Sequence, residues 1–520
     1  ETLTMTYHYR SYYLQQHSEH CGRYSRDSAG TDGGLPENTS LEESSDFKVL
    51  LSGTELKQSE SSSSLGSDCS SASQIQTSQN EEVMTDGWRS RRKHVFVLSE
   101  AGKPIYSRHG SEEALSSVMG VMMALVSFVQ VGGNTIQSIY SDGHTIVFMQ
   151  KGPLVLVSAS KSRQSELQLR SELLHVYHQI VSMLTQASIN RIFQRRKNYD
   201  LRRLLFGSEK VIDGLLDVME SEAGFLLSAV QCLPLASSSR DVLNQVLQKA
   251  VTPNLVLSLL VTKGQLLSIV QEKMVIEDAR LKPSDLHLLL NLIRASTSFQ
   301  TGEIWTPVCL PRFNPDCYFY TYVAYLDPPE CSVCLVLLST DKEAFYAVAE
   351  CKRKIEEGVR NNSVLQSISK AQPCQVRHVG VAELRHFLYI KNSGPEVEAP
   401  YATGEERVRL MDLYRHLHSR IHSSSRPLKL LYHSTQRETL LAWVTGKFEM
   451  YACFSPLVNK SLAIGAVTKL LRWIKKEEDC LFICSPPKYS TTPQPTRSFS
   501  NGRARADRQE ASESSFLSLL

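Results

Sequence analysis

Between residues 93 and 186, apolar and polar positions alternate in a way that predicts a small mixed domain. Short apolar runs with strand-like spacing occupy 93–107 and 134–161. A strongly apolar helix is predicted over 111–131 and an amphipathic helix over 164–186. The order is strand, strand, helix, three strands, helix. It predicts one antiparallel five-stranded sheet flanked by helices, a mixed α/β (α+β) fold.

The same order of elements recurs later in the chain. The second copy opens with a hairpin whose turn is Lys263-Gly264, continues with a helix and three strand-like runs, and closes with a helix. The third copy is looser. We therefore expect three domains of one topology, without evident residue identity between the copies. The expected boundaries are 89–208, 253–360 and 375–489 for the domains and 209–252 for a helical connector.

The two ends of the chain differ from the body in composition. Residues 1–88 contain 14 Asp/Glu against 5 Lys/Arg together with long serine runs, which predicts an acidic, disordered regulatory tail. Its serines beside acidic residues are candidate phosphorylation sites. A second disordered tail is expected at 490–520. The charge changes sign at the start of the first domain, where a basic corner could hold the acidic tail or simply be solvated. The residues of this corner that we take as basic surface candidates are Arg91, Arg92 and Lys93.

The helix predicted over 111–131 is more apolar than one sheet face requires. No charged residue occurs between Ala114 and Ser141, a pattern that is also seen in membrane-spanning helices. Several serines, and strands that need the helix as cover, argue against a span. We favour a helix that packs on its own sheet and is covered on its other side by a second protein. A helix buried wholly inside this chain is the alternative. The candidate contacts are Met119, Met122, Leu125 and Phe128.

A second basic group follows the first domain, within the helical pattern of 190–221. Arg195, Arg196 and Lys197 are candidates for contact with an acidic partner or anionic lipid, with a merely solvated face as the alternative. The net charge of +3 does not indicate nucleic acid as a partner. Twelve cysteines without a repeating framework favour a reducing, cytosolic compartment.

Sequence motifs of catalysis are not evident. Gly446-Lys447 lacks the upstream glycine and the hydroxyl of a phosphate-binding loop. His418 and His422 lie one helical turn apart, as zinc ligands can, but Ser419 stands where a metalloprotease has glutamate, so we interpret them as solvated or packing histidines. We expect no catalytic residue, no metal site and no cofactor. The cysteines that we interpret as ordinary packing or surface residues are Cys331, Cys334, Cys480 and Cys484.

Several long motifs resemble one known family. They are KHVFVLSEAGKPIYSRHGSEE, NYDLRRLL, GEIWTPVCLPRFN, LLAWVTGKFE and TKLLRWIKKEED. In this order, over about 93–490, they resemble the vacuolar fusion protein Mon-one family. The resemblance implies three longin domains, which agrees with the repeated order of elements.

The resemblance also implies a function. Family members form a complex with a second three-longin protein, Ccz-one, that acts as a guanine nucleotide exchange factor for the late-endosomal Rab GTPase (Rab-seven). Recruitment by the early-endosomal Rab (Rab-five) and by phosphoinositide membranes is implied, hence a cytosolic protein peripherally associated with endosomal and lysosomal or vacuolar membranes. Exchange requires a surface that deforms the switch loops rather than an acid–base pair. A longin adaptor or tether that only binds is the alternative.

Trp305 is a candidate contact for the early-endosomal Rab. Strand alternation over 303–313 places Trp305 opposite the more apolar face that holds Val308 and Leu310, and Pro307 indicates an edge strand. The resemblance implies that an exposed aromatic residue of the second longin domain takes part in recruitment. The alternative is that the following helix covers Trp305.

Overall fold

The computed structural model describes most of the chain between Trp88 and Ser490. The described residues are 88, 90–110, 115–141, 143–273, 281–295, 302–327, 330, 332–362, 364–372, 374–391, 396–398, 403–483 and 486–490. The tails predicted at either end lie, but for Trp88 and Ser490, outside these residues.

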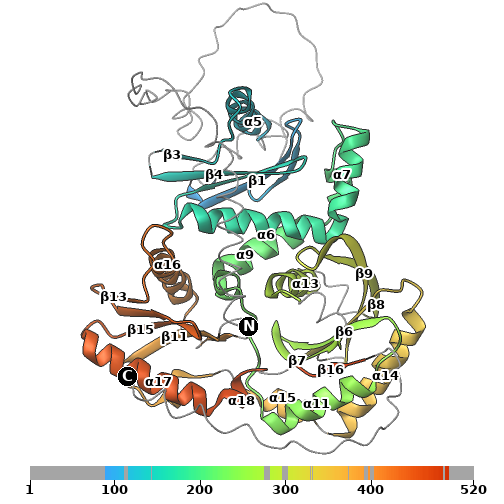
Figure 1. The fold of residues 1–520 in the computed structure, drawn as a ribbon, viewed down its shortest axis with the longest axis vertical. Helices are drawn as coiled ribbons and strands as arrows, with labels where there is room; N and C mark the ends of the chain where they lie inside the picture. Colours follow the sequence, from blue (N-terminus) through green and yellow to red (C-terminus); the bar gives the residue numbers. More distant parts are fainter. Residues whose placement is uncertain are drawn as a thin grey trace, which may run out of the picture.

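The first domain is an antiparallel sheet between two helices, with its strands in the order β2-β1-β5-β4-β3. These strands are β1 (Lys93–Ser99), β2 (Pro104–Ser107), β3 (Ser138–Ser141), β4 (His144–Lys151) and β5 (Leu154–Ser160). Helix α5 (Ser116–Val131) covers one face and α6 (Glu166–Leu184) the other (Figure 1). Phe96 and Leu98 of β1 pack on the α5 side, and Val95 and Val97 on the α6 side. Because both faces are covered, the strand is a continuous apolar run.

The second domain has the same strand order, β7-β6-β10-β9-β8. Its strands and helices are β6 (Leu255–Thr262), β7 (Gln265–Glu272), α13 (Pro283–Ala295), β8 (Ile304–Leu310), β9 (Asn314–Tyr325), β10 (Val333–Ser339), α14 (Phe345–Asn361) and α15 (Val364–Lys370). The predicted hairpin turn is confirmed. Lys263 and Gly264 both have positive φ, 47° and 80°, as a two-residue turn matched to the twist of a hairpin requires.

The third domain repeats the order again, as β12-β11-β15-β14-β13. Its elements are η2 (Val376–Val379), β11 (Leu384–Lys391), β12 (Glu396–Glu398), α16 (Gly404–Ile421), β13 (Leu430–Ser434), β14 (Thr439–Val444), β15 (Phe448–Phe454), α17 (Lys460–Lys476) and α18 (Glu478–Leu481). Helices α16 and α17 cover opposite faces of the sheet. The predicted threefold repetition of one topology is confirmed.

One part of the sheet prediction is wrong. The second sheet has six strands among the described residues, because β16 (Lys488–Tyr489) joins its edge parallel to β7. The Tyr489 hydroxyl donates a 2.8 Å hydrogen bond to the Leu255 carbonyl. The chain therefore returns from the third domain to complete the second, and the second sheet is mixed rather than antiparallel.

The helical pattern after the first domain is divided into separate helices. They are α7 (Gln186–Arg195), α8 (Arg202–Leu205), α9 (Glu209–Ser221), α10 (Gly224–Leu227) and α11 (Ser237–Lys249). Gly207 has φ of 81° between α8 and α9, a left-handed conformation that ends the α8 turn and redirects the chain. Helix α9 lies where the three domains meet (Figure 1).

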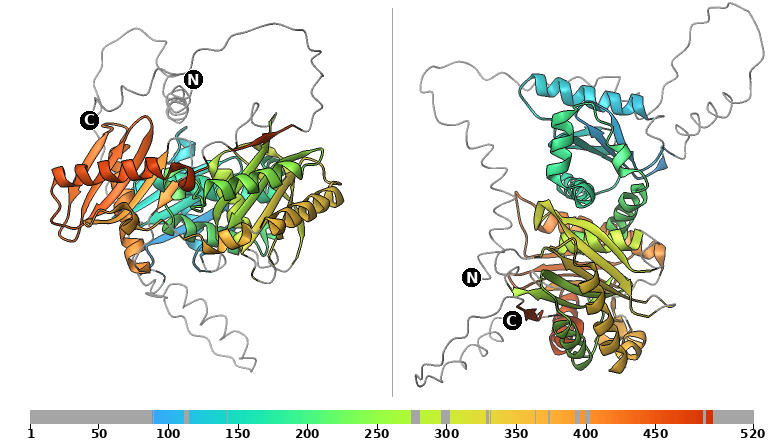
Figure 2. Two further views of the ribbon diagram at one scale, coloured as in Figure 1. Left: turned by 90° about the horizontal axis from the view of Figure 1, so that it is seen from below. Right: turned by 90° about the vertical axis from the view of Figure 1, so that its right-hand side faces the viewer.

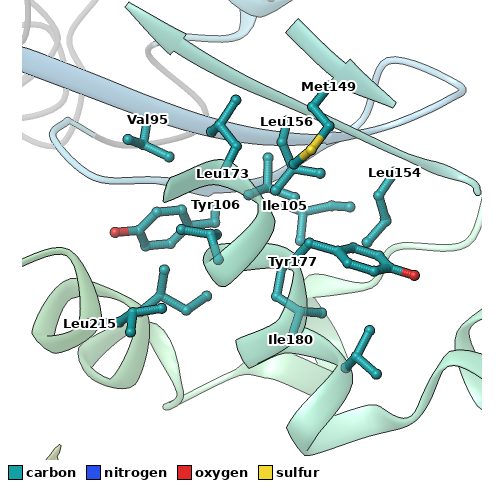
Figure 3. Packing of buried hydrophobic residues seen from close by; sticks show 14 of the residues in the cluster. Val95, Ile105, Tyr106, Met149, Leu154, Leu156, Leu173, Tyr177, Ile180 and Leu215 are labelled. Carbon is teal, nitrogen blue, oxygen red and sulfur yellow. The ribbon is translucent and has the colours of Figure 1, made fainter. Parts of the chain in front are cut away.

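The core below the first sheet extends into the rest of the molecule. Val95 and Leu156 of the sheet, Leu173 and Ile180 of α6, and Leu215 of α9 are all at most 1% exposed and belong to one cluster (Figure 3). The first domain therefore shares its α6-side core with the connector, which fixes it on the other two domains.

Candidate partner-binding surfaces

The outer face of α5 is uncharged and carries exposed apolar side chains among serines and Gln130. Val121, Phe128 and Val131 are 41%, 80% and 90% exposed, and Leu125 lies between them, half-buried. Their spacing places them along one side of the helix. Helix α5 lies on the face of the first sheet that is remote from the other two domains (Figures 1 and 2). A helix of a monomeric protein normally presents charged and polar residues to water, so this stripe has the composition of an interface.

Two of the four predicted contacts on this helix belong instead to the domain's own core. Met119 and Met122 are 0% and 5% exposed and pack against Phe96 and Phe148 of the sheet. Met119 and Met122 lie on the side of the helix opposite the exposed residues, so they face the strands. The candidate surface on α5 thus narrows to Leu125 and Phe128 among the predicted residues. None of the helices in the described part of the chain is long and apolar enough to cross a membrane.

The second basic group is exposed at one end of the first domain. Arg195, Arg196 and Lys197 lie at the end of α7, all exposed. Beyond them, Phe206 is 87% exposed in the segment between α8 and α9. Arg202, by contrast, is held by two 3.1 Å hydrogen bonds to the Asp200 carboxylate. An exposed basic cluster has the chemistry of a contact with an anionic surface.

Two residues of the basic corner at the start of the first domain form ion pairs within the chain. Lys93 is 5% exposed, and its ammonium lies 2.7 Å from Glu172 and 3.7 Å from Glu220. Its assignment as a surface residue is therefore corrected, because it is a buried ion-pair partner. Arg92 is exposed but binds Asp412 of the third domain at 2.5 Å. Arg91 is exposed.

Helix α9 joins the domains through its carboxyl-terminal half. Arg108 of the first domain binds Glu220 at 2.7 Å and Asp217 at 3.1 Å. Arg415 of the third domain donates to the carbonyls of Met219 at 2.8 Å and Glu220 at 2.5 Å. Arginines from two domains thus converge on one end of a helix, where carbonyls and the helix dipole favour positive charge. These bonds hold the first and third domains, which carry candidate surfaces, against α9.

Trp305 is neither fully exposed nor fully covered by the following helix, the two alternatives considered from the sequence. Its strand is the edge of the described sheet, as predicted, and Val308 packs on the opposite side, toward α13. The indole is half-buried. It stacks on Tyr320 with ring centroids 5.9 Å apart, meets Phe345 of α14 edge-on, and donates a 3.1 Å hydrogen bond to the Lys342 carbonyl. Helix α14 therefore covers part of Trp305 and leaves part of it accessible.

The histidine pair of the third domain has a partner that the sequence did not indicate. His418 and His422 lie 4.0 and 2.7 Å from the carboxylate of Glu449, which comes from β15. Glu449 was missed because strand pairing and helix packing, rather than local spacing, bring it to the helix.

Of the four cysteines singled out in the sequence, two belong to the described residues. Cys334 is buried in β10, Cys480 is partly exposed, and Cys331 and Cys484 lie outside the description. No disulfide joins the described cysteines. Burial raises the pKa of Cys453 to about 12, so this thiol is held protonated and is a poor nucleophile.

Comparison with known protein families assigns all three domains. Residues 93–215, 253–357 and 383–478 match the models described as the first, second and third longin domains of FUZ, MON1 and HPS1. The chain is 54% identical over 432 residues to mouse (Mus musculus) vacuolar fusion protein MON1 homolog B, covering 78% of each chain. The chain belongs to the MON1 family of vacuolar fusion proteins. The chain is also 53% identical over 419 residues to chicken (Gallus gallus) vacuolar fusion protein MON1 homolog A. The match covers 79% of this chain and 75% of the relative.

Membership of the MON1 family confirms the longin expectation. Each longin match spans the five antiparallel strands of one of the three sheets. The exposed stripe of α5 lies in the first longin domain and Trp305 in the second. The His418–Glu449 contact lies in the third. This MON1-family chain is thus a vesicle-trafficking protein whose candidate surfaces are distributed over separate longin domains.

Proposed function

We propose that this chain is one subunit of a heterodimeric guanine nucleotide exchange factor that activates the late-endosomal Rab GTPase (Rab-seven). The second subunit is a three-longin protein of the Ccz-one type. The activity serves endosome maturation, fusion with the vacuole or lysosome, and autophagy. Family membership supports the proposal, and the single structural observation that carries it is the uncharged, exposed face of α5.

The chemistry of the α5 face favours a longin partner. Phe128 and Val131 are almost fully exposed, and burying a side chain of this size contributes roughly 1.5–3 kcal/mol. With no charged residue between Ala114 and Ser141, the face offers no charge to a charged partner, and its exposed Phe128 and Val131 favour an uncharged, partly apolar counterpart. A second longin domain carries a helix at the equivalent place on its sheet. Two such helices can bury their outer faces together.

An exchange factor promotes nucleotide release by binding the GTPase through a surface of the right shape, and it needs no catalytic side chain. An exchange factor binds the nucleotide-free GTPase more tightly than the loaded one and shifts the equilibrium between them. Its binding surface must therefore hold its form against the switch loops. The first domain meets this requirement because its α6-side core is continuous with α9, and because Arg108 and Arg415 hold the carboxyl-terminal end of α9 from the first and third domains.

The proposal is tested by release of a fluorescent guanine nucleotide from the late-endosomal Rab. The chain purified with its Ccz-one-type partner should accelerate release. Phe128→Asp should abolish co-purification of the partner and the acceleration together. Leu457→Asp is the matched control, because Leu457 is 94% exposed but lies in the third domain. Binding of the Rab without faster release would instead identify an adaptor or tether.

We further propose that the basic end of α7 faces an anionic phosphoinositide membrane. Replacing Arg195, Arg196 and Lys197 by Glu should reduce binding to vesicles containing phosphatidylinositol 3-phosphate, and the wild-type binding should weaken with salt. A control variant replaces three exposed basic residues of α14 by Glu. These are Arg353, Lys354 and Arg360. Equal loss in both variants would count against a specific membrane face.

A further inference from the structure

Three potential metal ligands that are separated in the sequence converge in the third domain. His418 and His422 lie one turn apart on α16, and Glu449 lies on β15, which runs between β11 and β14 in the sheet. The ligand atoms of the three side chains all lie within 4.8 Å of one another. Two imidazoles and one carboxylate are a ligand set that suits zinc.

The spacing of the ligand atoms matches the size of such an ion. Zinc bonds of about 2.0–2.1 Å place tetrahedral ligand atoms roughly 3.3 Å apart. The Nε2 atoms of His422 and His418 lie 2.7 and 4.0 Å from the Glu449 carboxylate. These two distances bracket the ideal value. To bind an ion, the His422–Glu449 distance must lengthen and the His418–Glu449 distance must shorten, each by roughly 0.6–0.7 Å.

Two neighbours hold the Glu449 carboxylate in place. The His422 Nε2 atom lies 2.7 Å from it. The Tyr451 hydroxyl also donates a hydrogen bond to this carboxylate and orients it. The three side chains are 22%, 19% and 15% exposed, so water can reach a fourth ligand position.

We propose that His418, His422 and Glu449 bind one zinc ion with water as the fourth ligand. The ion joins α16 to the sheet that it covers. The same helix carries Arg415, which binds the carbonyls of α9, and Arg407, which donates a 2.7 Å hydrogen bond to the Ser221 carbonyl. The site thus stabilises the helix through which the third domain holds the connector. It is independent of the exchange activity proposed above.

The test is a calorimetric titration of the metal-stripped full-length chain with zinc, in excess magnesium. We expect one ion per chain, and at least tenfold weaker binding in His418→Ala/His422→Ala and in Glu449→Gln. His416→Ala is the matched control. His416 is on the same helix but faces His433, with ring centroids 6.2 Å apart. Zinc should also raise the melting temperature of the wild type and of His416→Ala, and of neither ligand variant.

Cobalt provides an independent readout, because its absorption reports the coordination geometry. A tetrahedral spectrum that disappears in Glu449→Gln supports the site. Glu449→Gln decides the question if the double histidine variant fails to fold. An absence of stoichiometric zinc binding by the wild type would overturn the proposal. So would binding that persists in Glu449→Gln or is lost in His416→Ala, and the cluster would then be a histidine–glutamate ion pair only.

Discussion

Replacement of Arg415 by Ala tests whether α9 holds the third domain in place. The Arg415 side chain is 7% exposed and makes two hydrogen bonds to the last carbonyls of α9, at 2.8 and 2.5 Å. A hydrogen bond to a charged group contributes about 1.5–3 kcal/mol, so the loss of two such bonds is about 3–6 kcal/mol. The reason is that the carbonyls of Met219 and Glu220, at the end of a helix, are left without these donors.

Arg92→Ala is the matched control, because Arg92 also binds Asp412 but is 54% exposed. An exposed pair contributes at most about 1 kcal/mol. Urea unfolding is followed by fluorescence. With a slope of about 3 kcal/mol per molar urea, the upper end of the range for small proteins, the Arg415→Ala midpoint should fall by roughly 1–2 M, and the Arg92→Ala midpoint far less. Equal, small shifts in the two variants would refute the role given to the α9 carbonyls.

Three further predictions address recruitment, the N-terminal tail and pH. Trp305→Ala should weaken binding of the early-endosomal Rab, measured by pull-down, while nucleotide exchange in solution is unchanged. A stability loss of several kcal/mol, as in core Trp truncation, would show that Trp305 is a core residue. Deleting 1–88 should leave the melting temperature nearly unchanged and raise activity or membrane recruitment; a large loss of stability would contradict a regulatory tail. Burial lowers the pKa of His178 to about 3 and, with the neighbouring His109 charge, that of His94 to about 4. The unfolded chain therefore binds more protons between pH 6.5 and 4, and stability should fall as pH falls through this window, with a smaller slope in His94→Gln; an unchanged slope would exclude His94.

Local patterns were sufficient for the order of elements. Strand β4 (His144–Lys151) falls within the strand-like segment predicted over 134–161, because alternating apolar positions mark it in the sequence. The Lys263-Gly264 turn was likewise readable from two residues. Strand β16 was not predictable in this way. It has two residues, and it is a strand only because the chain returns to pair with β7, more than two hundred residues earlier.

Sequence periodicity did not predict which residues of the candidate surfaces are buried. The apolar excess of α5 was visible, but the pattern alone did not separate the inward Met119 and Met122 from the outward Phe128. Lys93 read as a surface residue because its burial depends on Glu172 and Glu220, which come from distant helices. Side chains whose surroundings are assembled from several elements need the tertiary structure for their assignment.

Hydrogen exchange of α5 tests the central claim most directly. Amide exchange over 116–131 is measured for the chain alone and for its complex with the Ccz-one-type partner, with α14 as the internal reference. We predict that complex formation slows exchange in α5 and leaves α14 unchanged, because the uncharged outer face around Phe128 becomes buried. A stable complex in which α5 exchanges as fast as in the free chain would contradict the account.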